Sequence, residues 1–303
     1  MHLVTTTLAA IFIGGLLAAT VSAQDSKPEA DAKDLLKKAR LQHQRGDVEE
    51  ARATATEAIK ATLEVLIEGY ELRARIHSSK RDYAKAIADL NQMIRLDPKQ
   101  AGAYYLRGRE NFRTGRIDAS LADFDQYVVL RPKLEPRQWE RGISAYYAGK
   151  FKQGAKQFEL YQTYHDNDVE NSTWRYLCMA RTEGVAKARK VMLPIKNDTR
   201  VPMMKIFDLY RGKAKPEDVL TAARAGEPTK QQLHQRLFYA HLYLGLYYEV
   251  GGKVELAKKH IILAADKYMI EHYMGDVARI HAARFRKSCH LKPRQAGGLR
   301  PCL

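Results

Sequence analysis

The chain has 303 residues, of which 45% are hydrophobic and 28% are charged. This composition suits one elongated domain or two compact ones, and it excludes collagen, coiled-coil and wholly disordered classes. The formal net charge of +16 is spread along the chain without long basic runs. It favours anionic partners, or it only keeps an extended surface soluble.

The first 31 residues predict an export signal and a short linker. Residues 3–21 carry no charge, the small residues Val21-Ser22-Ala23 close this stretch, and a polar segment starts at Gln24. This arrangement is typical of a secretory signal peptide cleaved after Ala23. An uncleaved membrane anchor over residues 3–21 is the alternative, since that length just spans a bilayer. We therefore expect a signal peptide or anchor over 1–23 and a linker over 24–31.

From residue 32 onward, a self-similar segment recurs about every 34 residues. Four units start at Ala32, Ile67, Ala101 and Pro136, a fifth opens at Asn171, and a last one starts near Phe238. Small residues recur where the two helices of a helical hairpin would approach most closely: Ala39, Ala74, Gly108, Gly142, Cys178 and Gly245. Four such matches in succession are too many for chance, and they predict stacked helix pairs.

The pattern resembles the tetratricopeptide repeat family over about residues 32–165 and again over 238–270. The resemblance implies an all-α fold, a right-handed α-solenoid of helix hairpins. We expect four units over 32–165, truncated and degenerate helical repeats over 166–236, and a C-terminal unit with a capping helix over 237–287. Residues 288–303 are expected to form a flexible basic tail.

The C-terminal part resembles a narrower group, the NlpI-type tetratricopeptide proteins of the bacterial envelope. The resemblance rests on Phe238-Tyr239, on the run from Tyr243 to Tyr248, and on Ala264 followed by Glu271-His272-Tyr273. Members of that group are lipoproteins that act as adaptors between other envelope proteins. This chain lacks the lipid-attachment cysteine, because its first cysteine is Cys178.

The first helix of each pair is expected to line the concave side of the solenoid. The stripe opposite the packing residues is basic and aromatic in the middle units, and Tyr and Arg are the residue types common at binding hot spots. We predict a groove for an extended or helical acidic peptide, formed by Arg75, Tyr105, Arg109, Phe112, Arg113, Arg137 and Tyr147. The alternative is that the arginines are only solvated and the aromatic rings only pack.

Motifs for catalysis, metals or cofactors are not evident in the sequence. No two of the ten histidines have the i, i+4 spacing of a helical zinc site, and neither G-x-S-x-G nor a phosphate-binding loop occurs. Gly251-Gly252-Lys253 falls at an expected turn between helices. Cys178 should pack as a small apolar group, whereas Cys289 and Cys302 could close a disulfide in an oxidising compartment. We therefore expect no enzyme, no metal and no cofactor.

These features predict an extracytoplasmic scaffold or adaptor, periplasmic or secreted, or tethered through residues 3–21. Its expected partners are other proteins, envelope proteins with acidic segments above all, and no nucleic acid is expected. One alternative is the binding of polyanions or cell-wall polymers through the basic surface. A second is a catalytic site hidden within residues 194–236. The sequence leaves the oligomeric state open.

Overall fold

The computed structural model describes residues 27–290, with side chains over 31–287. The predicted signal peptide and its cleavage site lie outside the described residues. Every regular element within them is a helix, which confirms the all-α prediction. None of these helices combines the length and hydropathy that crossing a membrane requires. The chain divides into two units, residues 1–69 and 70–303, which are described separately.

The first unit contains α1 (Lys27–Arg45) and the first part of α2 (Val48–Ser79). Gly46 ends α1 with a φ of +87°, and its N–H donates to the His43 carbonyl at 3.1 Å. Glycine adopts this left-handed conformation without the steric cost of a Cβ atom. Ala39, at a position where the repeat pattern places a small residue, is buried, and so are Ala51 and Ala58.

Helix α2 runs without a break over 32 residues, so the predicted turn between the repeat that starts at Ala32 and the repeat that starts at Ile67 is wrong. In the next two repeats a proline, Pro98 or Pro132, follows the second helix and prevents it from continuing. In the repeat that starts at Ala32, Leu63, a good helix former, occupies the equivalent position. The second helix of one predicted pair therefore continues into the first helix of the next.

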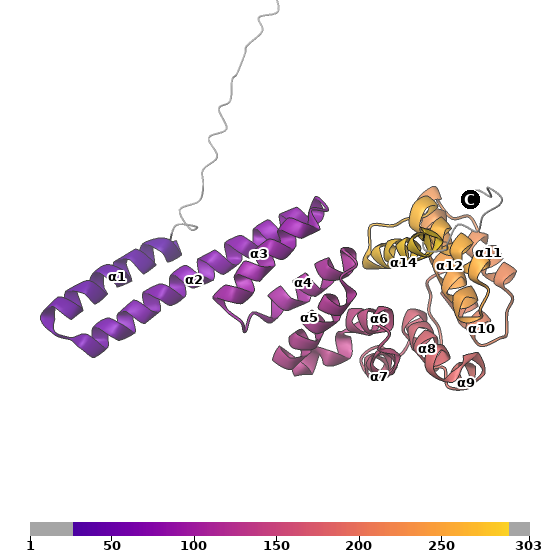
Figure 1. The fold of residues 1–303 in the computed structure, drawn as a ribbon, viewed down its shortest axis with the longest axis horizontal. Coiled ribbons are helices and arrows are strands. Elements are labelled where there is room, and N and C mark those ends of the chain that lie inside the picture. Colours follow the sequence, from indigo (N-terminus) through magenta and orange to yellow (C-terminus); the bar gives the residue numbers. More distant parts are fainter. Residues whose placement is uncertain (1–26, 291–303) are drawn as a thin grey trace, which may run out of the picture. The chain divides into compact units, whose positions relative to one another are not determined.

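The second unit begins with the end of α2 and α3 (Tyr83–Leu96). The hairpin of α4 (Ala101–Arg113) and α5 (Ile117–Leu130) follows, then the 3-10 helix η1 (Pro132–Arg137) and the hairpin of α6 (Trp139–Tyr147) and α7 (Phe151–Gln162). Each helix packs mainly on its neighbours in sequence (Figure 1). This succession of hairpins is an α-solenoid.

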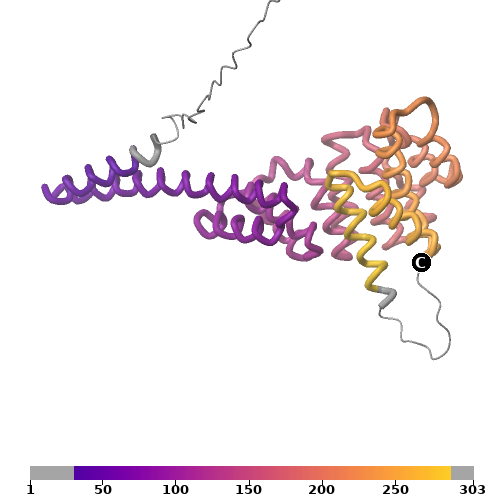
Figure 2. The backbone as a smooth tube through the Cα atoms, turned by 90° about the horizontal axis from the view of Figure 1, so that it is seen from above, coloured from indigo at the N-terminus to yellow at the C-terminus, as the bar shows by residue number. Residues whose placement is uncertain are grey.

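Shorter helices follow: α8 (Val169–Glu183), α9 (Val185–Lys190), α10 (Met203–Tyr210) and α11 (Pro216–Arg224). The last hairpin is formed by α12 (Lys230–Val250) and α13 (Val254–Ile262), which the π-helical turn η2 (Leu263–Lys267) extends. Helix α14 (Tyr273–His290) then packs on α13, on η2 and, much earlier in the chain, on α4 (Figure 2).

Two predicted boundaries are corrected. Helix α12 begins at Lys230 rather than near residue 237, because Thr229 and Gln232 form a capping box that starts it earlier. The Gln232 N–H donates to Thr229 Oγ1 at 3.2 Å, and the Thr229 N–H donates to Gln232 Oε1 at 2.9 Å. At the other end, α14 continues to His290, so a flexible tail does not begin at residue 288.

The predicted close approaches of paired helices are confirmed at three glycines. A Cβ atom at Gly142 would lie 2.6 Å from Phe158 Cζ, and one at Gly245 would lie 2.6 Å from Ile261 Cγ1. At Gly108 the corresponding distance to the Phe124 ring is 3.2 Å. Distances near 2.6 Å are far inside van der Waals contact, so only glycine lets these helices cross so closely.

The variant Gly245→Ala is expected to lower the free energy of unfolding by about 1–3 kcal/mol, because the added methyl group overpacks the crossing. The Ile261 side chain could rotate away, but the Ile261 backbone nitrogen, 3.1 Å from the added atom, could not. The matched control is Gly69→Ala on exposed helix α2, where nothing lies within 4 Å. It should stabilise by roughly 0.5–1 kcal/mol. Urea titrations in which both variants shift stability in the same direction would contradict this packing.

An arginine ladder, formed by Arg73, Arg107, Arg141 and Arg175, repeats every 34 residues through the second unit. Each guanidinium bonds to a group 16 residues later: Asp89, Asp123, Gln157 and the Val191 carbonyl, respectively. The last three arginines also bond to a group 16 residues earlier: Asn91, Asp125 and Glu159. Arg107, Arg141 and Arg175 therefore tie their helices to the segments before and after them, and Arg73 ties α2 to α3.

The ladder also corrects the repeat register. Its spacing of 34 residues places the start of the fourth unit at Glu135 rather than Pro136, and the start of the fifth at Val169 rather than Asn171. Helix α8 indeed begins at Val169. Although the start of this repeat shifts, Cys178 is buried and lies at a close contact between helices, as predicted. Its Sγ is 2.8 Å from the position that a Cβ atom on Gly154 would occupy.

Candidate functional site

Helix α14 covers much of the groove that the sequence predicts. It begins with Tyr273, whose buried ring stacks on Phe112 of α4 at 5.1 Å and meets the edge of Trp139 of α6 at 5.2 Å. Just before α14, the ring of His272 stacks on Trp139 at 6.5 Å. Part of the basic and aromatic stripe that was predicted to bind a partner is thus covered by the chain's own C-terminal segment, as the alternative of packing rings allowed.

Phe112 and Tyr147 do not face an open groove, and this part of the prediction is corrected. The exposed fraction is 0% for Phe112 and 6% for Tyr147, and the two rings meet edge-on at 5.5 Å. The Tyr147 hydroxyl shares a 2.8 Å hydrogen bond with Nδ1 of His281 on α14. Burial, as the largest cause, raises the pKa of Tyr147 well above its usual value. Both rings are packing residues.

Tyr105 and Arg109 lie side by side at the border of this covered region. The half-buried Tyr105 hydroxyl donates to Glu140 at 2.7 Å, and its pKa is raised, chiefly by burial and then by the Glu140 charge. The Arg109 guanidinium lies over the rings of Tyr105 at 5.8 Å and Tyr273 at 5.4 Å. Within the described residues, Arg109 has no carboxylate at ion-pair distance, and its Nε is buried without a hydrogen-bond partner.

Arg113 is already engaged by its own chain. Its Nε donates to Asp276 of α14 at 2.8 Å, and its Nη1 donates to Glu110 at 2.8 Å and to Ser78 at 2.9 Å. Arg279 of α14 donates to the Arg113 carbonyl oxygen at 2.8 Å. Arg113 therefore attaches α14 to α4 rather than waiting for a partner.

Arg75 and Arg137 lie apart from one another and are both exposed. Arg75 pairs with Glu71 one helical turn earlier at 2.6 Å. Arg137, in η1, lies 4.6 Å over the ring of Tyr164. The structure thus separates the seven predicted residues into two buried rings, two exposed arginines and three partly buried residues, which are Tyr105, Arg109 and Arg113.

What remains open is an arginine cleft between the ends of α2 and α4 and the segment from η2 to α14. Its volume is about 490 Å³. The charged side chains that line it are five arginines and three carboxylates: Arg81, Arg109, Arg113, Arg279, Arg286, Asp266, Glu271 and Asp276. A smaller cavity of about 280 Å³ adjoins it. Arg109 and Arg113 line both cavities, and Arg75 lines only the smaller one. The arginines outnumber the carboxylates, so the cleft favours an anionic group.

Four arginines of the cleft have carboxylate partners. Arg81 pairs with Glu271, Arg286 with Asp266 at 2.7 Å, and Arg113 and Arg279 share Asp276 at 2.8 and 3.3 Å. Arg109 is the fifth: its guanidinium lies over two tyrosine rings, and Glu110 and Glu140 act on its charge from beyond ion-pair distance. A guanidinium in this position can still form a bidentate bond with an incoming carboxylate.

A buried polar chain holds α14 at its middle. His281 joins Tyr147 on one side and Glu249 of α12 on the other, at 3.4 Å, and Glu249 pairs with Arg181 of α8 at 2.9 Å. Burial alone would raise the pKa of Glu249, but the His281 hydrogen bond and the Arg181 charge outweigh it and hold that pKa at about 2. Helices far apart in sequence are thus fixed to one another.

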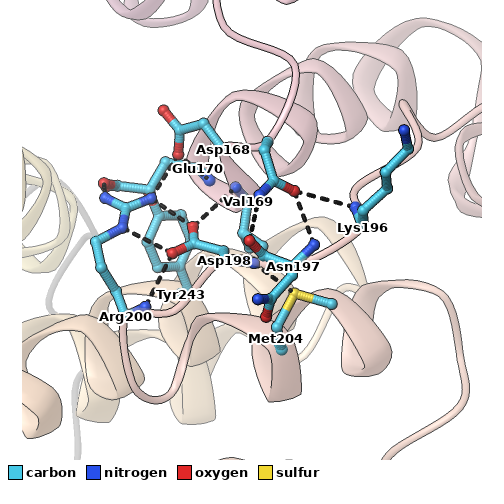
Figure 3. Close-up of polar contacts among 10 residues, drawn as sticks. Asp168, Val169, Glu170, Lys196, Asn197, Asp198, Arg200, Met204 and Tyr243 are labelled. Atoms are coloured by element: carbon cyan, nitrogen blue, oxygen red, sulfur yellow. Dashed lines mark hydrogen bonds and ion pairs between the residues drawn. The ribbon is translucent and has the colours of Figure 1, made fainter.

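Arg200 organises the stretch that connects α9 to α10 (Figure 3). Its guanidinium bonds to Asp168 at 2.6 Å, Glu170 at 2.7 Å and Asp198 at 2.6 Å. The side-chain oxygen of Asn167 accepts hydrogen bonds from the backbone N–H groups of residues 196 and 197. Residues 194–200 are therefore held to the start of α8, and the side chains of Asp198 and Arg200 take part in these contacts.

The cysteines and metal-binding residue types offer no further site in the described range. Burial raises the pKa of the Cys178 thiol, which suits a packing role. Cys289 lies in the last turn of α14, but Cys302 lies outside the described residues, so their pairing remains a prediction. Across residues 27–290, no three His, Cys, Asp or Glu side chains gather in a metal-binding arrangement.

Comparisons with known proteins agree with the repeat architecture. Two solved tetratricopeptide repeat proteins are similar, each with a TM-score of 0.37: one from Parabacteroides merdae (17% identity, covering 82% of this chain and 83% of that chain) and the C-terminal part of one from Cytophaga hutchinsonii (16% identity, covering 84% and 92%). These superpositions are too loose to inform function. No curated protein matches. The family model for the tetratricopeptide repeat matches residues 72–141, and this segment, which spans α3 to α5 and the start of α6, is therefore a tetratricopeptide repeat region.

Proposed function

We propose that the protein is an exported scaffold that captures an acidic segment of a partner protein in the arginine cleft. Tetratricopeptide hairpins are frameworks for protein binding, and such solenoids use extended surfaces to hold partners. The observation that carries the proposal is Arg109, the one cleft arginine without a carboxylate partner among the described residues. We propose no catalytic role for the chain.

The cleft suits a carboxylate better than a neutral peptide. Arg109 stands between two tyrosine rings, which fix its guanidinium plane and keep it partly out of water. A partner's Asp or Glu side chain reaching Arg109 would form a charge-assisted bond in a partly desolvated place. The paired arginines around Arg109 add a positive field but little specific attraction for a ligand, because their charges are largely neutralised by the carboxylates with which they pair.

The exported location and the adaptor role belong to the same proposal. The uncharged residues 3–21 and the small residues before Gln24 support export to the periplasm or beyond, with cleavage after Ala23 or retention as a tether. The NlpI-type resemblance of residues 238–273 supports an envelope adaptor whose partners are other envelope proteins.

A fluorescence anisotropy titration tests the cleft. The probes are a labelled peptide rich in Asp and Glu and the same peptide with Asn and Gln, and the protein is residues 24–303. We expect the acidic peptide to bind and Arg109→Gln to weaken it about tenfold, the value of one charge-assisted pair. Arg95→Gln is the matched control, because Arg95 is exposed on α3 and lines neither cavity. Arg113 is unsuitable, because its substitution would also detach α14.

Salt separates this proposal from the binding of polyanions over the whole basic surface. Binding of the acidic peptide at one partly buried guanidinium should be only partly lost at about 0.5 M salt. Binding of a polyglutamate chain through diffuse attraction to the whole surface should be lost completely. Equal losses in Arg109→Gln and Arg95→Gln, with complete loss of binding in salt, would favour the polyanion alternative and contradict a cleft site.

A further inference from the structure

A second cavity, separate from the arginine cleft, has the opposite charge. It has a volume of about 160 Å³ and lies between the first turn of α6, the middle of α7 and the start of α8, with His272 and Met274 closing one side. Four aromatic residues form much of its wall: Trp139, Phe158, Tyr161 and Trp174. Trp174 and Phe158 stack at 6.5 Å with an angle of 20° between their planes, so two of the rings in this wall lie nearly parallel.

The ionisable side chains of this aromatic cavity, apart from His272, are acidic. Asp168 and Glu170 line it, and no lysine or arginine does. Burial, and then the charge of Asp168, raises the pKa of Glu170 to about 7, so this carboxyl is partly ionised at neutral pH and a bound cation would favour its charged form. Their nearest cation, Arg200, is shared among Asp168, Glu170 and Asp198, so three carboxylates face one guanidinium. This excess of negative charge stands out in a chain whose net charge is +16. The His272 ring adds no cation, because burial, and then the charge of Arg109, lowers its pKa.

Two polar atoms of the wall have no partner. Asn171, 3% exposed, donates from Nδ2 to the Phe158 carbonyl at 3.1 Å and to Gln162 at 3.0 Å, while its Oδ1 is buried without a donor. Trp174 Nε1 is likewise buried without an acceptor. Buried polar atoms are normally satisfied, so these two mark a place where the fold alone does not complete the hydrogen bonding.

We propose that this cavity binds a small organic cation, an alkylammonium group that lies against the tryptophan faces with its charge towards Asp168 and Glu170. Aromatic faces attract ammonium groups through the ring quadrupole, most strongly where water is excluded, and quaternary ammonium ligands are bound in this way. The two carboxylates supply the counter-charge that Arg200 leaves unmatched. The volume admits a group of trimethylammonium size and no folded segment. The ammonium group comes either from a free amine or from a partner's lysine side chain.

Binding can be followed directly, because both tryptophans of the chain line this cavity. A titration of the whole protein with choline should give a saturable change in tryptophan fluorescence, with a dissociation constant on the order of 1 mM. The neutral isostere 3,3-dimethylbutan-1-ol should bind at least about tenfold more weakly, because it has the same shape without the charge. N-acetyl-lysine amide tests the peptide source: competition with choline assigns the site to lysine side chains as well, and its failure assigns it to free amines.

Two variants complete the test. Glu170→Gln should weaken choline binding about tenfold, whereas Glu183→Gln, an exposed carboxylate on the same helix, should leave it unchanged. If Glu170→Gln destabilises the protein because Arg200 loses a partner, the comparison of choline with its neutral isostere on the unaltered protein still tests whether the cavity binds the cation. No saturable signal, or equal affinities for choline and the neutral alcohol, would overturn the proposal.

Discussion

Replacing Tyr273 by alanine should lower the free energy of unfolding by about 3–5 kcal/mol, the usual cost of deleting a large buried aromatic side chain. The Tyr273 ring is 1% exposed and fills the space between Phe112, Trp139 and Arg109. Its removal would leave a cavity at the point where α14 meets α4 and α6. Urea unfolding followed by circular dichroism gives the loss, and tryptophan fluorescence reports the change beside Trp139.

Tyr273→Phe is the control for this experiment. It keeps the ring and removes only the hydroxyl, so its effect should stay within about 1 kcal/mol of the unaltered protein. If Tyr273→Ala were also that mild, α14 would not be packed into the groove as described. If the two variants were equally harmful, the hydroxyl rather than the ring would be the stabilising part.

The second large effect is expected at the arginine ladder. Arg107→Leu should destabilise by about 3–5 kcal/mol, because it leaves a buried carboxylate without its cation. Arg107 holds Asp123 through both Nε and Nη2, the shortest bond being 2.6 Å, and Asp123 is 4% exposed. After the substitution, Asn111 Nδ2, at 2.9 Å, would be its remaining side-chain donor. Thermal and urea unfolding of the variant measure the loss.

Two further variants isolate the cause of this loss. Adding Asp123→Asn to Arg107→Leu removes the unpaired charge and should recover a substantial part of the stability. Arg52→Leu breaks an ion pair with Glu49 in which both side chains are largely exposed, so it should cost about 1 kcal/mol or less. Equal losses in Arg52→Leu and Arg107→Leu would mean that the ladder has no special energetic role.

The features that the sequence predicts well are those set by local sterics. Gly108, Gly142 and Gly245 could be placed at helix crossings because a missing side chain at a fixed repeat position has one simple structural reason. The turn at Gly251-Gly252-Lys253 could be predicted in the same way, since α12 ends at Val250 and Gly252 adopts a positive φ that suits a helix end.

The groove was predicted less well, because its cover comes from far along the chain. A repeat pattern shows which stripe of α4 faces inward, but it does not show that Tyr273, 161 residues after Phe112, fills that stripe. The sequence did offer one signal, since Tyr273 and Ile280 are spaced as apolar neighbours on one helix face. A capping helix with such a face must bury it somewhere, and the concave side was available.

The arginine ladder was missed for a different reason. Its position in each unit is one where tetratricopeptide repeats usually carry leucine, so an arginine there counts as a mismatch when apolar residues are sought. The useful signal was the 34-residue spacing of Arg73, Arg107, Arg141 and Arg175, each with a polar group 16 residues on. That spacing would also have given the correct starts of the fourth and fifth units.

Helix α14 is an integral part of the second unit and leaves the arginine cleft as the open part of the groove. Hydrogen–deuterium exchange of the whole protein tests this arrangement. The amides of residues 277–287 should exchange about as slowly as those of α4, because the same contacts cover both helices. Exchange in α14 at the rate of an exposed, unpacked segment, with α4 still protected, would contradict it.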